Sequence, residues 1–294
     1  MIGRPLPFLL LLAALVACSE PPEPEPAATV TDDTGRTIPY VEQPARVISL
    51  APSVTELAFA AGLGDRLVAV TTADNYPPEV ADIARISALP LNHEEVVALR
   101  PDLVLASDQV NDPRDAEALA EVGIPTYYVS VQTLPGVSRA VRAMGTLFGD
   151  STAAAVYADS LEAGLRALDR GRTESPERPG VIFLIGDETL YSFGPESYVH
   201  SMIETAGGRS LTARMDTEAP ILSEEFVLSA APDVILTAFE GDAAHLARLH
   251  PSWASVPAIA GGRVHRIDAD LVLRPGPRLI AGTHAIQEAL KGSR

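Results

Sequence analysis

Six histidines and one cysteine are the side chains of this 294-residue sequence that could bind a transition metal or act in nucleophilic catalysis. The histidines are scattered, with none four residues from another, at His93, His200, His245, His250, His265 and His284. The sequence has no cysteine pair, no G-x-S-x-G elbow, no Walker loop, no H-E-x-x-H and no complete G-x-G-x-x-G. It therefore predicts neither an enzyme nor a metal site, and we expect no built-in cofactor.

Two glutamates stand at the head of a repeated stretch, and their chemistry would be charge pairing with a partner. EEVVALRPDLVLA (Glu94–Ala106) and EFVLSAAPDVILT (Glu225–Thr237) superpose with an offset of 131 residues. Each copy predicts a short helix, a Pro-Asp stop and a buried strand, with the glutamate in the first helical turn, where the helix dipole favours a carboxylate. Two such charges on equivalent lobes suit a partner with two-fold symmetry, although ordinary helix-terminal charge would give the same pattern.

The single cysteine follows a secretory signal. Residues 1–18 place one positive charge, at Arg4, before an apolar run from Phe8 to Ala17 that is too short to span a bilayer stably. The run ends in LVAC, which resembles the lipobox of bacterial lipoproteins, so we expect cleavage before Cys18 and lipid attached to it. This predicts a membrane-anchored lipoprotein of the periplasm or cell surface.

Composition separates the start of the chain from a folded body. Residues 19–45 are expected to be a tether and lead-in, because the alternating proline and glutamate of SEPPEPEP favour an extended, self-repelling chain. Hydrophobic residues make up 47% of the sequence, which is enough for the remainder to bury a core. The formal charge of −17 argues against nucleic acid as a partner, because phosphate binding needs a basic surface.

From residue 46 onward, short apolar runs alternate with helical patterns, which predicts parallel sheets covered by helices. The predicted strands are 46–50, 67–71, 103–107, 126–130, 180–186, 233–237 and 262–268. The predicted helices are 53–62, 92–100, 115–123, 198–208 and 277–290, together with the second repeat helix. Ser53 is expected to cap the first helix, with Glu56 three residues later as in a capping box.

One long helix is predicted between the two halves. Ser151–Arg172 is rich in alanine, holds apolar residues at helical spacing and has no internal proline. A helix of this length would measure about 30 Å and would be a stiff connector. We therefore expect an α/β fold with two Rossmann-like lobes of parallel sheet, an N-terminal lobe over 46–150 and a C-terminal lobe over 174–294, joined by a connecting helix over 151–173.

Several motifs in combination resemble the helical-backbone periplasmic binding proteins, which serve ABC importers of siderophore-bound iron, haem and cobalamin. RVISLAPSVTELAFAAGLGDRLVAVT (Arg46–Thr71) is similar to the opening of this family, and NYPPEV, ALRPDLVLAS and GIPTYYV follow in the family's order. SFGPESYVHSMIETAGG and SEEFVLSAAPDVIL resemble its C-terminal half. The resemblance runs from Arg46 to Leu290, and within the family it is strongest to the cobalamin-binding protein.

The resemblance implies a monomer that binds a small metal chelate and delivers it to an importer permease with its ATPase. Cobalamin is the first expectation for the ligand, and a ferric siderophore or haem is the second. In the family, one surface glutamate on each lobe meets arginines of the two permease subunits, which implies docking roles for Glu94 and Glu225.

The positions that match the family's ligand cleft are Ser53, Ala73, Tyr191, Asp270 and Arg274. Tyr191 keeps an aromatic ring, whereas Ala73, Ser107 and Ala219 stand where the cobalamin binder carries aromatic residues. Asp270 and Arg274 match a polar pair at the cleft edge, although a surface ion pair would use the same residues.

Other ligands would need other side chains. Haem would need an axial ligand, for which Tyr76 and Tyr191 are candidates. An anionic siderophore would need arginines such as Arg274 and Arg214. A secreted lipid-anchored enzyme and a relative that has lost ligand binding and acts as an interaction module remain alternatives from other functional classes.

Overall fold

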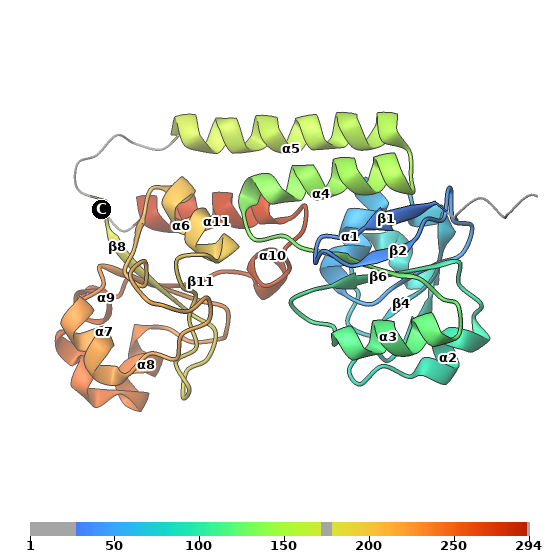
Figure 1. Ribbon diagram of the computed structural model, residues 1–294. Coiled ribbons are helices and arrows are strands. Elements are labelled where there is room, and N and C mark those ends of the chain that lie inside the picture. Colours follow the sequence, from blue (N-terminus) through green and yellow to red (C-terminus); the bar gives the residue numbers. More distant parts are fainter. Residues whose placement is uncertain (1–27, 172–177, 293–294) are drawn as a thin grey trace, which may run out of the picture.

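The computed structural model describes residues 28–171 and 178–292, which form two α/β lobes bridged by long helices (Figure 1). Cys18, the proline- and glutamate-rich stretch and Arg172 lie outside the described residues. No helix among the described residues is long and apolar enough to cross a bilayer. The predicted fold class is confirmed, because each lobe is built on one parallel sheet.

The N-terminal lobe is a five-stranded sheet in the order β5-β4-β3-β6-β7, with every neighbouring pair parallel. Its strands are β3 (Val47–Ser49), β4 (Leu67–Thr71), β5 (Ala84–Ile86), β6 (Leu103–Ser107) and β7 (Thr126–Val129). Its helices are α1 (Pro52–Ala60), α2 (His93–Ala98) and α3 (Pro113–Glu121). Every residue of β6 and β7 is buried, as expected of parallel strands covered on both faces.

The C-terminal lobe is built in the same way, on a four-stranded parallel sheet in the order β11-β10-β8-β9. Its strands are β8 (Gly180–Leu184), β9 (Arg209–Ser210), β10 (Val234–Thr237) and β11 (Val264–Arg266). Its helices are α6 (Tyr198–Ala206), α7 (Glu224–Ala230), α8 (Ala243–Leu249), α9 (Pro257–Ala260), α10 (Ala269–Val272) and α11 (Leu279–Lys291). The repeated stretches become α2 with β6 and α7 with β10, so the repeat in the sequence is a repeat in the fold.

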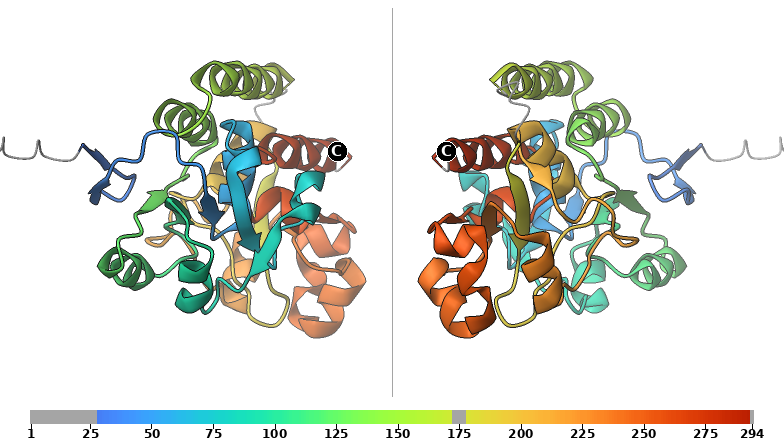
Figure 2. Two further views of the ribbon diagram at one scale, coloured as in Figure 1. Left: turned by 90° about the vertical axis from the view of Figure 1, so that its right-hand side faces the viewer. Right: turned by 90° about the vertical axis from the view of Figure 1, so that its left-hand side faces the viewer.

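The connection between the lobes is the predicted long helix, α5 (Ser151–Gly171), which runs above both lobes beside α4 (Leu134–Leu147) (Figure 1). The two helices cross closely at Gly145, where an added Cβ would lie 2.2 Å from the Cβ of Ala154. At its far end α5 packs against α11 of the C-terminal lobe. Viewed along its axis in Figure 2, α5 lies at the rim of the molecule and the two sheets lie beneath it.

A β-hairpin precedes the first lobe, inside the range expected to be tether and lead-in. It pairs β1 (Thr29–Thr31) with β2 (Thr37–Pro39) in antiparallel fashion. The carboxylate of Asp32 in its turn accepts hydrogen bonds from the backbone of Thr34 and Arg36, and Ile38 is buried in the core. Residues 19–45 are therefore not tether throughout, because the folded body already begins with this hairpin.

Candidate functional site

A cavity of about 400 Å³ lies between the two lobes. It is lined by Asp108, Gln109 and Gln132 from the N-terminal lobe and by Phe193, Ser197, Tyr198, Glu218 and Ala219 from the C-terminal lobe. The N-terminal residues follow the carboxyl ends of β6 and β7. This edge of a parallel sheet is where open α/β folds place their ligands, and the volume is within the range of small-molecule sites.

On the N-terminal wall, polar side chains are held in place by the backbone around them. Gln109 donates from Nε2 to the carbonyl of Val131 at 3.2 Å, and Gln132 donates from Nε2 to Asp108 Oδ2 at 3.4 Å. The other carboxylate oxygen, Asp108 Oδ1, is buried and accepts no hydrogen bond from the described residues. Other atoms of the protein cover this oxygen, so a ligand in the cavity would reach it only after the wall rearranges.

On the C-terminal wall, two segments pair into an antiparallel ribbon, residues 189–194 with residues 217–222. The amides of Leu222, Ser192 and Gly194 donate to the carbonyls of Leu190, Pro220 and Glu218 at 2.8 to 2.9 Å. At Gly194 the strands approach so closely that an added Cβ would lie 1.8 Å from the Thr217 oxygen. The ribbon brings Phe193, Glu218 and Ala219 to the cavity.

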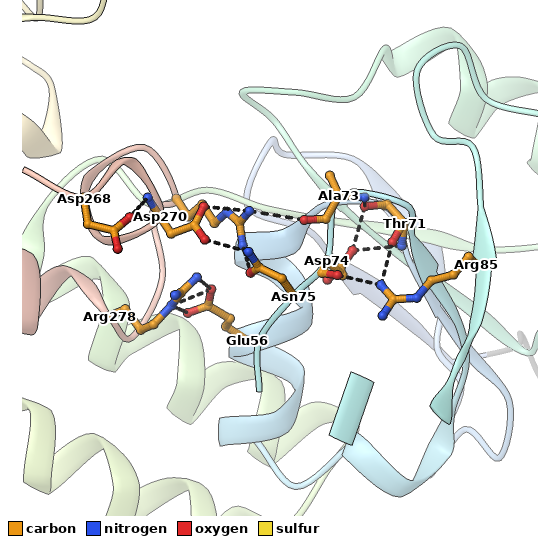
Figure 3. Close-up of polar contacts among 10 residues, drawn as sticks. Glu56, Thr71, Ala73, Asp74, Asn75, Arg85, Asp268, Asp270 and Arg278 are labelled. Atoms are coloured by element: carbon orange, nitrogen blue, oxygen red, sulfur yellow. Dashed lines mark hydrogen bonds and ion pairs between the residues drawn. The ribbon is translucent and has the colours of Figure 1, made fainter. Parts of the chain in front are cut away.

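A polar contact joins the lobes at one side of the cavity (Figure 3). Arg274, beyond α10, donates to Asn75 Oδ1 at 2.5 Å and to the carbonyl of Ala73 at 3.2 Å. Asn75 donates to Asp270 Oδ2 at 2.6 Å, and Asp270 Oδ1 lies 2.8 Å from Arg274. Each polar side chain of this interlobe contact thus binds the other two, so Asp270 and Arg274 form a pair that reaches across to the opposite lobe.

The N-terminal side of the interlobe contact is a rigid loop after β4. Asp74 is buried and its Oδ2 accepts hydrogen bonds from the amide and the hydroxyl of Thr71 at 2.8 and 2.6 Å. Arg85 of β5 donates to the carbonyls of Thr71 and Asp74 (Figure 3) and to that of Val80. These bonds fix the loop that presents Ala73 and Asn75.

A second interlobe pair is deeply buried. Arg278, just before α11, donates from Nε and Nη2 to Glu56 of α1 at 3.0 and 2.7 Å, and its guanidinium lies 4.6 Å from the ring centre of Tyr76. Burial raises the pKa of the Glu56 carboxyl above its ordinary value, against the hydrogen bonds and charge of Arg278, which lower it. The expected capping role was wrong: Ala51 is the N-cap of α1, Ser53 lies in the first turn, and Glu56 pairs with the other lobe.

The five residues matched to the family's cleft separate into two places. Ala73, Asp270 and Arg274 belong to the interlobe contact, and the carbonyl of Ser53 lies 3.4 Å from an ideal Cβ at Gly276, two residues beyond Arg274. Tyr191 lies on the ribbon with 45% of its surface exposed. None of the five is among the residues that line the 400 Å³ cavity.

Two further candidates also lie away from that cavity. Tyr76 lines another cavity, of about 640 Å³, between α5 and α11, together with Tyr157, Arg278 and His284. Arg214 is exposed on the segment between β9 and α7. Sequence reasoning missed Asp108, Gln109 and Gln132, although polar residues directly after two buried parallel strands were the signal that could have found them.

The two repeated glutamates occupy equivalent positions. Glu94 is the second residue of α2 and Glu225 is the second residue of α7, and both are exposed. Each helix is capped in the same way, because the side chains of Asn92 and Ser223 accept a hydrogen bond from the backbone amide three residues on.

Comparisons with known proteins agree with this architecture. The profile of the periplasmic binding protein family matches residues 47–271. YvrC of Bacillus subtilis, an uncharacterized ABC transporter substrate-binding lipoprotein, is 29% identical over 299 residues, which cover 96% of this chain and 95% of that protein.

Solved structures of the same shape bind different ligands. The periplasmic vitamin B12-binding protein BtuF of Vibrio cholerae has a TM-score of 0.76 and 27% identity, over 86% of this chain and 99% of that one. The periplasmic heme-binding protein RhuT of Roseiflexus sp. RS-1 has a TM-score of 0.75 and 25% identity, over 84% and 98%. With the family profile spanning most of the sequence and the two lobes joined by a helix, the chain belongs to the class III periplasmic binding proteins and is a binding protein, not an enzyme.

Proposed function

We propose that the protein is a lipid-anchored substrate-binding protein that captures a metal-chelate nutrient, cobalamin first, and delivers it to an ABC importer. The match to a substrate-binding lipoprotein over nearly the whole of both chains supports the transport role. Cys18 would carry the anchor, and the residues between it and the hairpin would hold the body away from the membrane. The ligand would sit between the lobes, where the 400 Å³ cavity opens.

The mixed polar wall of Asp108, Gln109 and Gln132 is the observation that carries the choice of cobalamin. The carboxylate of Asp108 can accept a hydrogen bond from a neutral donor such as an amide, and the amides of Gln109 and Gln132 lie on the same wall. The rim of a corrin ring bears neutral amide groups that match this set. The corrin rim would therefore place amides, and no carboxylate, against this wall, so no charge repulsion with Asp108 would arise.

Anionic chelates suit the cavity less well. Haem carries two carboxylates, and the cavity wall already contains the acidic side chains of Asp108 and Glu218. Arg274 is engaged by Asp270 and Asn75. Haem remains the second candidate because Tyr191, exposed on the ribbon, offers a phenol of the kind that can ligate haem iron.

The test is a direct comparison of ligands on the purified protein. Cyanocobalamin and hemin are titrated separately, and binding is followed by equilibrium dialysis and visible absorbance. We expect cyanocobalamin to bind, and Asp108→Asn to weaken it about tenfold, as loss of a charge-assisted hydrogen bond does. Asp82→Asn, an exposed carboxylate outside the cavity, is the matched control. Tight hemin binding without cyanocobalamin binding would overturn the ligand assignment and leave the transport role standing.

The docking role of Glu94 and Glu225 has its own experiment. Both side chains are exposed and neither lines the cavity, so Glu→Gln at both positions should leave ligand affinity unchanged. Docking on the permease–ATPase complex of the same organism should weaken, and it should weaken further with salt, as charge pairing does. Glu121→Gln on α3 is the control. Wild-type docking by the double variant would leave the repeat as a feature of the fold alone.

A further inference from the structure

His250 is a buried histidine whose two ring nitrogens both face hydrogen-bond acceptors. It follows α8, and its ring stacks on Trp253 with the ring centres 4.1 Å apart and the planes 22° apart. Its Nδ1 lies 3.0 Å from Glu224 Oε1, and its Nε2 lies 2.8 Å from the backbone carbonyl of Asp187. Only 7% of the side chain is exposed, so water does not replace either partner.

This geometry requires the protonated form of the ring. A carbonyl oxygen only accepts, so Nε2 must carry a hydrogen. Hydrogen bonds from His250 and Ser252 lower the pKa of the Glu224 carboxyl, so it is an anion at neutral pH and Nδ1 must donate as well. A neutral imidazole would leave a lone pair pointing at one of two oxygens. The indole face of Trp253 also favours a cation above it.

One acceptor of His250 lies close to the ribbon, and the other lies on the helix that carries Glu225. Asp187 lies in the turn after β8, two residues before the ribbon begins. Glu224 opens α7, directly before Glu225, and the other strand of the ribbon ends at Leu222. His250 thus joins the outer end of the ribbon to the first turn of the helix that carries the docking glutamate.

We propose that His250, as an imidazolium, is the positioning residue of the docking surface on the C-terminal lobe, holding Glu225 at a fixed place relative to the ligand cleft. The partner is a permease subunit with basic side chains, and the inference rests on the docking role proposed above. An exposed carboxylate on a seven-residue helix gains specificity for such a partner when the backbone beneath it does not move.

Few charged side chains surround His250 among the described residues. Ser252 donates to Glu224 Oε2 at 2.9 Å. The carboxylate of Asp187 faces away, toward His245 Nε2 at 2.9 Å, and Arg248 lies 3.4 Å from the other nitrogen of His245. Among the described residues, Glu224 is therefore the carboxylate that hydrogen-bonds to His250.

The first experiment reads the charge of His250 through its neighbour. Trp253 is the single tryptophan of the chain, and a stacked imidazolium quenches indole emission. We expect the wild-type protein to be quenched at neutral pH and Glu224→Gln to emit more strongly, since the anion that favours the cation is gone. Glu225→Gln, one residue on, should leave the emission unchanged. Equal emission from the two variants would overturn the imidazolium bridge.

The second experiment asks whether the bridge acts through Glu225. In docking assays on the permease–ATPase complex, His250→Gln should weaken binding severalfold, both as a single change and when it is combined with Glu94→Gln. In Glu225→Gln it should add less than a twofold effect, because the group it positions is gone. Glu224→Gln, with a side chain 47% exposed, should give the same result without altering a buried residue.

The outcomes separate the two proposals. If neither glutamate variant weakens docking, the docking surface itself is wrong, and the role given to His250 is wrong with it. Suppose that Glu94→Gln and Glu225→Gln each weaken docking, and that adding His250→Gln weakens both variants further by the same factor. The docking surface is then correct, and His250 is only a structural residue of the lobe. Additivity with Glu94 and non-additivity with Glu225 would support the positioning role.

Discussion

Replacing Arg278 with methionine would leave the Glu56 carboxylate without its partner where the two lobes meet. The Glu56 side chain is 2% exposed and accepts hydrogen bonds at 2.7 and 3.0 Å from Arg278. Removing one member of a buried ion pair costs about 3–5 kcal/mol when the other stays charged. Because Arg278 is 17% exposed and its attraction is partly screened, we expect a loss near the lower end of that range at neutral pH.

The loss should depend on pH in a definite direction. The pKa of Glu56 in the folded protein is raised above its ordinary value of 4.5, chiefly by burial. The folded state then holds the proton more tightly than the unfolded state, so the group's contribution is most favourable below the unfolded pKa and is lost as pH rises through the folded one. Without Arg278 the charge of the more distant Arg274 still opposes burial, but the larger opposing contribution is gone and the pKa of Glu56 rises further. The deficit of Arg278→Met should therefore be smaller at pH 5 than at pH 8.

Urea unfolding followed by circular dichroism at both pH values measures this. Glu56→Gln in the Arg278→Met background removes the titrating group, so the double variant should lose the pH dependence. Arg114→Met is the control, because Arg114 pairs with Asp112 on the exposed surface of α3 and should lose no measurable stability. A deficit in Arg278→Met below about 1 kcal/mol, or one equal at both pH values, would mean that the pair is not formed between the lobes in solution.

Four other changes have equally definite expectations. Cys18→Ser should release the protein from membranes, and retention after a salt wash would contradict the lipid anchor. Because α5 (Ser151–Gly171) is one continuous helix, small-angle scattering should give nearly equal radii with and without cyanocobalamin, and a clear contraction would speak against a stiff connector. Gly194→Ala should cost about 1–3 kcal/mol, since its Cβ would meet the Thr217 oxygen, and an unchanged unfolding midpoint would mean the ribbon can open. Tyr191→Ala, outside the cavity lining, should leave cyanocobalamin binding and thermal stability unchanged, and weakened binding in dialysis would extend the ligand site along the ribbon.

The elements that the sequence predicts well are those buried on both faces. The strands predicted at 67–71 and 103–107 coincide with β4 and β6, because a central parallel strand is a continuous apolar run between polar turns. The hairpin at Thr29–Pro39 was missed because its strands are three residues long. Helix α4 was missed because Pro135 and Gly136 were read as a turn, although proline is favourable in a first helical turn and the side chain of Thr133 caps this helix.

The candidate site was less predictable because its contacts join distant parts of the chain. Glu56 and Arg278 are separated by 222 positions, and nothing near either residue indicates a partner. The local pattern instead favoured a capping box, which competes for the same glutamate. Arg274 was found only through the family resemblance, which named it with Asp270 and Ala73 but not with its partner Asn75.

The internal repeat predicts that Glu94 and Glu225 occupy equivalent positions, but it does not show which residues contact the helices that carry them. The offset that aligns Glu94 with Glu225 also aligns His93 with Glu224, a pairing of opposite charge types that a sequence comparison counts as a mismatch. In the structure both positions contact the next helical segment: His93 Nε2 lies 3.0 Å from Asp115 Oδ1 of α3, and Glu224 lies 3.0 Å from His250. In each lobe the first residue of the helix, α2 or α7, therefore belongs to a histidine–carboxylate contact, with the histidine on the helix in one lobe and the carboxylate on it in the other. The contact, and not the residue at either position, is what the two lobes share.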